Sequence, residues 1–396
     1  MTKQEKIERL EFLKNKAIEI KKEAEYYNAL QLALKLVLNG SYGALATAYF
    51  VLFNNNVAGS ITAHGREVIQ LMEKANNDYW YNMWHLDTEL HEKLNLKNVR
   101  QIDKSYPVSI YCDTDSLFAS FQPAMDHCEW QHMYSSGLDF IMDVDKHRIA
   151  QYFIDSLDEY GRKYGVENKH DFELERISES IINMAKKKYI QHIVYEDGIP
   201  YDRFNYIYPK GVELVRSSTP LFAREKIVEI VKYLFKNPDT FNIKELLKLV
   251  KGLRKEFDLC VPDRIDDIAL QSSCTNYDEK VINDKNKLEF VTGAHFAVKA
   301  AAYYNYLLYK NKDLQAKYEF IKSGSKIKYY YTENAEQPIF AYLRDQFPIE
   351  FAPRVDMATQ FEKALLSPIN SIIEPLNMPE ITKRLGVVID IFGSGF

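Results

Sequence analysis

The sequence predicts an α+β fold, in which a sheet-rich centre lies between helical segments. Three observations support this prediction. Residues 1–39 contain no glycine or proline, and their apolar residues recur at spacings of three and four, which is typical of one long helix. Two central segments show the alternation and turn residues of β-hairpins. Helical periodicity then returns from about residue 221.

The first helix begins with charged turns and ends in the apolar stretch ALQLALKLVLN. A helix that is apolar on all sides is normally buried, so we expect its C-terminal half to enter a core. Residues 39–43 (NGSYG) should end the helix, because two glycines permit a sharp change of direction. A further helix is expected at about 64–84.

Two hairpins are expected in the centre of the chain. The alternating segments PVSIYC and SLFASF flank Asp113-Thr114-Asp115, which places both aspartates at the tip of the first hairpin. The stretch KKKYIQHIVYEDGIPYD predicts a second hairpin, because Asp197-Gly198 is a strong turn signal. The segments REKIVEIVKYLFKN and IKELLKLVKGLRKEF then predict two helices.

Composition limits the class of protein. The 396 residues are 46% hydrophobic, which leaves room for two or three domains and excludes a disordered chain. The net charge of −5 does not favour a dedicated nucleic-acid-binding protein, although a large enzyme can hold a local basic strip on an acidic body.

Cysteine usage and hydropathy predict an intracellular protein. The four cysteines lack a CxxC spacing, which indicates a reducing compartment rather than a disulfide framework. No apolar run approaches the ~18 residues of a membrane span, and the charged start is unlike a signal peptide. We therefore expect a cytoplasmic protein, in the host cytoplasm if it is viral, with no membrane partner.

The pair Asp113 and Asp115 allows two interpretations. Aspartate is common in turns, so one interpretation is an ordinary hairpin turn. The other is a site for Mg²⁺, because a hard cation prefers oxygen ligands and is often held by one or two carboxylates together with substrate phosphates.

A second group, Lys35, Asn39 and Tyr42, has the spacing i, i+4, i+7, which places all three residues on one helix face. Lys35 is the only charged residue between Glu25 and Gly43. Such a lysine either extends its ammonium group to water past its apolar neighbours or binds a phosphate.

Together these stretches resemble the family B DNA polymerases, in particular the branch found in large tailed bacteriophages. KLVLNGSYGAL resembles the family's motif on the fingers helix, in which Lys, Asn and Tyr precede a Gly, and YCDTDS resembles its palm motif. AKKKYIQHIVYEDG resembles the Lys-Lys-Arg-Tyr strand, and KGVELVRSSTP resembles the segment that leads from palm to thumb. One position departs from the pattern, because Gly40 follows Asn39 where the family usually has Ser.

The resemblance implies a right-hand polymerase fold. Its parts would be a partial fingers helix (1–43), a palm with an antiparallel sheet (44–220), a mostly helical thumb (221–385) and a C-terminal tail (386–396). The implied reaction is nucleotidyl transfer from a dNTP to the 3′-hydroxyl of a primer paired to template DNA, with two Mg²⁺ ions.

The resemblance also implies a role for each matching residue. Asp115 and Asp113 would be the catalytic metal ligands. Lys35 and Asn39 would face the incoming triphosphate, and Tyr42 would pack beneath the nascent base pair. The residues implied to contact DNA are Lys186, Lys187, Lys188, Tyr189, Lys210 and Arg216.

One essential part of that family's site has no counterpart in the sequence. The palm needs a second metal aspartate, on a motif such as Asp-x-x-Ser-Leu-Tyr-Pro-Ser before the fingers, and DKSYP at 103–107 stands in the wrong place. We therefore expect an N-terminal polymerase subunit to supply this aspartate and the exonuclease; a truncated chain would look the same. Without that partner we expect little activity, because losing one stabilising group costs on the order of a hundredfold or more.

Several other interpretations remain open. The tail GVVIDIFGSGF resembles a peptide that docks on a sliding clamp, and a non-catalytic DNA- and clamp-binding module is the alternative to an enzyme. A reverse transcriptase would need adjacent aspartates, so Thr114 argues against it. HCEWQH offers too few ligands for zinc, and we favour surface residues there. DFELE is interpreted as an acidic palm strand, with Glu175 near the metal site.

Overall fold

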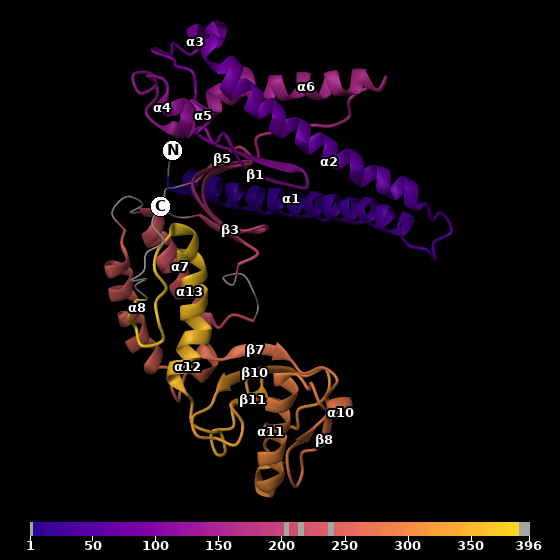
Figure 1. The fold of residues 1–396 in the computed structure, drawn as a ribbon, viewed down its shortest axis with the longest axis vertical. Helices are drawn as coiled ribbons and strands as arrows, with labels where there is room; N and C mark the ends of the chain where they lie inside the picture. The colour runs from indigo at the N-terminus through magenta and orange to yellow at the C-terminus, as the bar shows by residue number, and fades with distance from the viewer. Residues whose placement is uncertain (1–2, 202–205, 213–217, 237–240, 388–396) are drawn as a thin grey trace. The chain divides into compact units, whose positions relative to one another are not determined.

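The computed structural model describes residues 3–201, 206–212, 218–236 and 241–387, and the chain divides into two compact units, Met1–Glu173 and Leu174–Phe396 (Figure 1). Both units combine helices with small antiparallel sheets, so the predicted α+β class is confirmed. In the described part of the chain, no helix is long and apolar enough to cross a membrane.

Two long helices open the first unit. Helix α1 (Lys3–Leu45) is followed by α2 (Asn55–Asp78), whose N-terminus is capped by the Asn54 side chain, which accepts hydrogen bonds from two backbone amides at 3.1 Å. The chain continues from α2 into a π-helical turn, η1 (Tyr79–Met83), and a 3₁₀ turn, η2 (Trp84–Leu86). The helix expected at about 64–84 is therefore present but begins earlier.

Helix α1 differs from the prediction in two ways. It continues through residues 39–43 to Leu45, because neither Gly40 nor Gly43 adopts a positive φ, and a helical glycine costs only about 1 kcal/mol. Its apolar C-terminal half is also not buried: Leu36 is 63% exposed and Leu38 is 71% exposed. The periodicity of the sequence correctly predicted the helix. Burial of its apolar half depends on neighbouring elements, which the described residues do not supply.

The core of the first unit forms around Trp80, Trp84 and Phe140, which are fully buried. Besides α2, this core is built by α3 (Thr88–Lys93), α4 (Gln122–Asp126), α5 (Gly137–Val144), the π-turn η3 (Asp145–Ile149) and α6 (Ala150–Lys163). The first predicted hairpin is confirmed as β1 (Ser109–Asp113) and β2 (Ser116–Ala119), and α2 contacts both strands.

The second unit begins with a four-stranded antiparallel sheet. Its strands are β3 (Arg176–Ala185), β4 (Lys188–Glu196), β5 (Ile199–Pro200) and β6 (Ile207–Lys210), and β4 pairs with the other three. The predicted turn at Asp197-Gly198 is confirmed, since both residues have positive φ (47° and 86°) between β4 and β5. The β3–β4 turn was not predicted; Lys186 and Lys187 form it, whereas their resemblance motif implied a strand.

Two helices follow the sheet, as predicted: α7 (Leu221–Lys236) and α8 (Ile243–Asp258). The later part of the chain is less helical than expected. It contains the sheet β11-β10-β7 (Ile339–Leu343, Lys326–Tyr331 and Leu270–Ser273) and the pair β8–β9 (Val281–Asn283 and Glu289–Phe290). The short helix α9 (Ile265–Ile268) precedes β7, whereas the short helix α10 (Tyr277–Lys280) and the longer α11 (Phe296–Lys310) lie between these strands in the sequence.

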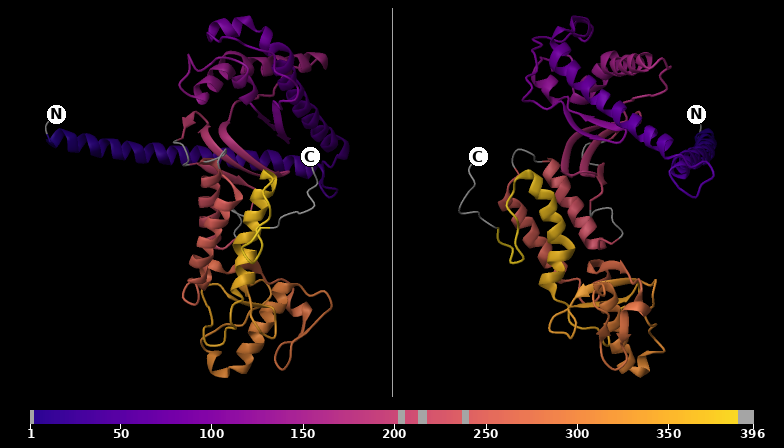
Figure 2. Two further views of the ribbon diagram at one scale, coloured as in Figure 1. Left: turned by 60° about the vertical axis from the view of Figure 1, so that its left-hand side comes forward. Right: turned by 45° about the vertical axis from the view of Figure 1, so that its right-hand side comes forward.

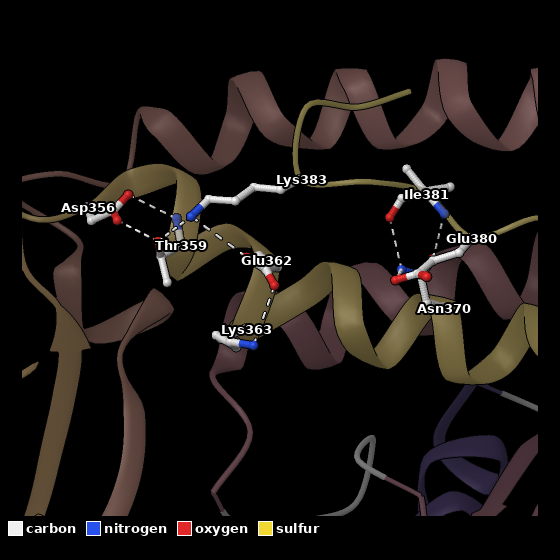
Figure 3. Close-up of polar contacts among 8 residues, drawn as sticks. All are labelled: Asp356, Thr359, Glu362, Lys363, Asn370, Glu380, Ile381 and Lys383. Carbon is white, nitrogen blue, oxygen red and sulfur yellow. Dashed lines mark hydrogen bonds and ion pairs between the residues drawn. The ribbon is translucent and has the colours of Figure 1, made fainter. Parts of the chain in front are cut away.

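The last helices return alongside α7 and α8 (Figure 2). They are α12 (Met357–Phe361), the π-turn η6 (Glu362–Leu366), α13 (Ser367–Ile373) and the 3₁₀ turn η7 (Glu374–Leu376). Asn370 then ties down the following segment, because its amide donates to the Ile381 carbonyl at 2.9 Å and its oxygen accepts from the Ile381 N–H at 3.1 Å (Figure 3). Lys383 adds an ion pair to Glu362 at 3.7 Å. The apolar residues predicted to form a docking tail, 389–396, lie outside the described residues.

Candidate active site

The two aspartates stand at the tip of the β1–β2 hairpin. Asp113 pairs with Ser116, so Thr114 and Asp115 form a two-residue turn. The turn is closed by the backbone N–H of Asp115, which donates to the Asp113 carbonyl at 2.7 Å, and by the Ser116 hydroxyl, which donates to the same carbonyl at 3.1 Å. Thr114 adopts a φ of 58°, which is unusual for a β-branched residue, and its hydroxyl donates to the Asp113 carboxylate at 3.2 Å.

The base of this hairpin is anchored on α2 by a buried amide. Asn76 is 1% exposed, and its Nδ2 donates both to the Val108 carbonyl at 3.1 Å and to the Ser109 hydroxyl at 2.9 Å. Its Oδ1 accepts from the indole of Trp80 at 2.9 Å. A fully hydrogen-bonded amide in a core holds its neighbours in one position, so the hairpin projects from a rigid support.

The tip offers oxygen ligands of the kind that Mg²⁺ prefers. Asp113 is half-buried and Asp115 is exposed, so at least one carboxylate is open to a ligand. A Mg²⁺ ion shared between two carboxylates and substrate phosphates fits this donor set. A two-ion centre needs a further carboxylate, and no three His, Cys, Asp or Glu side chains in the described ranges gather as a metal site.

The second predicted group lies on α1 in the same unit. Lys35, Asn39 and Tyr42 are exposed, and α1 remains helical through all three, so the i, i+4, i+7 spacing places them on one face. Helix α2 contacts α1 and also the strands β1 and β2. Helix α2 therefore contacts both the helix that carries this group and the hairpin that carries the aspartates.

The structure brings four of the predicted DNA-binding lysines to one corner of the sheet in the second unit. Lys186 and Lys187 form the β3–β4 turn and Lys188 begins β4, while Lys210 ends β6 and lies opposite Tyr189. We call these four lysines the lysine corner. All four are exposed, and their positive charges are gathered on adjacent backbone segments.

Tyr189 has a different position from the lysines. Its side chain is 4% exposed, and the Nζ atom of Lys210 lies 5.7 Å from the centre of its ring. A cation over an aromatic face is favourable, so Tyr189 positions Lys210 from beneath. Arg216, the remaining predicted DNA contact, lies outside the described residues.

The other polar candidates have local hydrogen-bond partners. A ring nitrogen of His127 lies 2.7 Å from the Pro123 carbonyl, and one of His132 lies 2.9 Å from the Asn95 carbonyl. Cys128 is buried rather than on the surface, and burial raises the pKa of its thiol to about 12. Glu175 is exposed and belongs to the second unit.

One structural residue of the lysine corner was missed from the sequence. Gly211 has a φ of +67°, and a Cβ atom there would lie 2.0 Å from the carbonyl oxygen of Lys187. Only glycine allows this approach, so Gly211 sets the position of the β3–β4 turn. The sequence feature that could have identified Gly211 is its position directly after the strand that ends at Lys210, since a glycine there often marks a close approach of two backbone segments.

Comparison with known proteins finds sequence similarity to DNA polymerases. Residues 8–151 match the family model of DNA polymerase family B, a range that includes Lys35, Asn39, Tyr42, Asp113 and Asp115. The chain is also 25% identical over 353 residues to the DNA polymerase catalytic subunit of Human herpesvirus 7 (strain JI), covering 86% of this chain and 31% of that protein. It is 27% identical over 212 residues to DNA polymerase 1 of Aeropyrum pernix, covering 53% of this chain and 15% of that protein.

These similarities are weak but agree with one another, and they show homology to viral and archaeal family B DNA polymerases. The chain spans less than a third of the length of either relative. The match to the bacteriophage branch in particular remains a prediction.

Proposed function

We propose that the chain is the C-terminal catalytic portion of a replicative DNA-directed DNA polymerase, with its fingers, palm and thumb parts in the predicted order. The observation that supports this most directly is the hairpin tip. Asp113 and Asp115 stand at the tip of a hairpin whose base is anchored by a buried amide, inside the range that matches the polymerase family.

In this proposal, Asp115 and Asp113 hold Mg²⁺ at the primer terminus. When bound, Mg²⁺ neutralises charge on the triphosphate and on the attacking 3′-oxygen. The protein's own contribution is to hold both carboxylates at the tip of the hairpin. The hydrogen bonds from Thr114 and Ser116 to Asp113 limit the movement of this tip.

The α1 residues would bind the incoming dNTP. Lys35 supplies a positive charge for the triphosphate, and Asn39, one turn later on the same face, supplies an amide that can donate a hydrogen bond to it. Tyr42 continues that face and presents an aromatic ring to the nascent base pair.

The lysine corner would hold the primer-template duplex. Lys186, Lys187, Lys188 and Lys210 provide point charges for phosphates, and such contacts carry no sequence information, as a replicative enzyme requires. Tyr189 contributes by supporting Lys210. Arg216 completes the proposed set.

The proposal includes a partner. The further metal carboxylate, and the exonuclease, would be supplied by an N-terminal polymerase subunit. The apolar surface of α1 supports this part, since Leu36, Val37 and Leu38 are each more than 60% exposed and a surface of this kind is usually covered by another chain.

Primer extension tests the proposal. We would purify the tagged chain with its associated proteins from the source cell and measure single-nucleotide extension with Mg²⁺, beside the Asp115→Ala variant. A matched control is Asp126→Ala, because Asp126 is also an exposed residue of the first unit and its carboxylate accepts a hydrogen bond from the Gln122 amide. We expect Asp115→Ala to abolish synthesis and leave DNA binding intact, whereas Asp126→Ala keeps both.

A mutant complex that still extends primers would show that Asp115 is not a metal ligand of the reaction. The isolated chain is measured in parallel. Extension by this chain alone would show that all the necessary carboxylates belong to it, with Glu175 as the candidate for the further one, and the partner part of the proposal would be wrong.

A further inference from the structure

A pair of histidines joins two parts of the first unit that are far apart in the sequence. His64 lies on α2, and His170 lies in the segment 164–173 that follows α6. Their Nε2 atoms are 2.8 Å apart, which is a hydrogen-bonding distance. The ring planes are tilted by 42° and the ring centres are 5.0 Å apart, so the rings meet through these nitrogens and not face to face.

The hydrogen bonds around His64 decide which of its nitrogens carries the proton. The Tyr160 hydroxyl donates its hydrogen to the Glu67 carboxylate at 2.6 Å, so its oxygen accepts from Nδ1 of His64, 3.3 Å away. Neutral His64 therefore has its proton on Nδ1 and a lone pair on Nε2. It follows that His170 supplies the hydrogen of the contact between the two Nε2 atoms.

The backbone of His170 is held in place by Asn168. The Asn168 side chain accepts from the His170 N–H at 2.8 Å and donates to the His170 carbonyl at 3.2 Å. The same amide donates to Asp158 of α6 at 3.0 Å. Helices α2 and α6 pack against each other (Figure 1), and the histidine contact adds a bond between α2 and the segment that Asn168 holds on α6.

The charged residues beside the pair are engaged elsewhere or are positive. Glu67 reaches His64 only through the Tyr160 hydroxyl. In the segment, Lys169 pairs with Glu167 at 2.7 Å, and Asp171 accepts from the next backbone N–H at 2.9 Å. Arg66 is exposed on α2. Within the described residues, no carboxylate bonds directly to either imidazole ring.

We propose that His64 and His170 form a proton-controlled clasp between α2 and the segment 164–173. While at most one ring is protonated, one Nε2 atom keeps a lone pair and the hydrogen bond persists. When both rings are protonated, two N–H groups and two positive charges face each other at 2.8 Å, so the contact opens. This inference concerns the histidine contact alone and does not rest on the proposed function.

The direction of the pH effect agrees with the surroundings of His170. Partial desolvation of its ring lowers the pKa of His170, and the neighbouring His64 lowers it further. A histidine pKa that is lower in the closed state stabilises that state above the ordinary value of about 6.5, and the stabilisation is lost as the pH falls below that value. The clasp is therefore closed at neutral pH and opens in mild acid.

Hydrogen exchange of the full chain tests the clasp. Protection of the amides of residues 166–172 is measured from about pH 5.5 to pH 8, a range above the ordinary carboxylate pKa of about 4. Each rate is taken relative to an unstructured peptide of the same sequence at the same pH. EDTA is present, so that no metal ion bridges the rings. Exchange around the fully buried Trp80 shows whether the unit remains folded.

Three variants separate the effect of the proton from the effect of the contact. His170→Gln keeps an amide that can donate to or accept from His64 but does not titrate, so it should stay protected throughout the range. His170→Ala removes the contact and should be unprotected throughout. His132→Gln is the matched control, because His132 is an exposed histidine of the same unit that bonds the Asn95 carbonyl, and it should behave like wild type.

We expect wild-type protection to fall about tenfold between pH 7.5 and pH 5.5, because a proton-linked population changes about tenfold per pH unit once the group titrates. Equal protection at the two pH values would overturn the inference. The same loss in His170→Gln would also overturn it, since another group would then be titrating. Wild-type protection of His170→Ala at pH 7.5 would show that the contact holds nothing, with the same consequence.

Discussion

Gly211 lies directly against the carbonyl group of Lys187, so closely that a Cβ atom would stand 2.0 Å from the carbonyl oxygen. This contact joins the end of β6 to the β3–β4 turn and holds the lysine corner together. Gly211→Ala must therefore displace the turn and also place alanine at a φ of +67°. We expect it to destabilise the second unit by ~2 kcal/mol or more and to weaken duplex binding.

Gly198→Ala is the matched control for that change. Gly198 belongs to the same sheet and has a φ of +86°, but nothing lies within 4 Å of its Cβ position. It should show only the backbone cost of about 1 kcal/mol in thermal unfolding and should leave duplex binding unchanged. Equal effects of the two substitutions would show that the Lys187 contact has no importance of its own.

Thr114→Gly should stabilise the hairpin tip and impair its function. A β-branched residue at a φ of 58° is strained, and glycine relieves that strain by about 1 kcal/mol. The same change removes the hydroxyl that bonds the Asp113 carboxylate at 3.2 Å. We expect a higher unfolding temperature together with slower primer extension by the assembled enzyme. A less stable variant would contradict the strain argument.

Asp145→Asn should change stability in a pH-dependent way. Partial burial at the start of η3 raises the pKa of Asp145 to about 6, whereas the unfolded chain has a value near 4. The folded state therefore binds this proton more tightly, and the resulting stabilisation is complete below about pH 4 and is lost as the pH rises through about 6.

The asparagine variant should therefore be more stable than wild type by about 2 kcal/mol near pH 7.5 and equal to it near pH 4. Urea unfolding of the chain at several pH values measures this difference. Asp155→Asn, at an exposed carboxylate bonded to Gln151, is the control and should show no such trend. A difference that is constant with pH would rule out burial of the charge as the cause.

Asn370→Ala should release the segment that follows α13. Asn370 makes two hydrogen bonds to the backbone of Ile381, and Ile381 is 1% exposed. Losing both should cost about 2 kcal/mol. We expect faster tryptic cleavage at Lys383, measured by mass spectrometry, whereas Ser371→Ala, which loses only an exposed bond to the Ser367 carbonyl, should be cleaved like wild type. Unchanged cleavage in the Asn370 variant would show that the segment is held by other contacts.

The features that were predicted correctly from the sequence have local causes. The tip at Asp113 and Asp115 and the turn at Asp197-Gly198 follow from alternation and turn residues within a few positions. The turn at Lys186 and Lys187 has no such signal, because its cause is Gly211, which meets it only in the folded sheet.

The same distinction applies to the rest of the fold. The segments KIKYYY and IFAYL, which form β10 and β11, are rich in the aromatic and β-branched residues that favour strands. They were nevertheless predicted to belong to a mostly helical thumb, because the resemblance to the polymerase family implied one.

The exposed apolar half of α1 has a consequence for when the nucleotide site forms. Helices in water owe most of their stability to packing, and Leu36, Val37 and Leu38 have little of it. We therefore expect the amide protons around Lys35 to exchange rapidly with solvent in the free chain and slowly once this surface is covered. The residue proposed to hold the triphosphate would then become ordered only on assembly, so an incomplete enzyme would not sequester dNTPs.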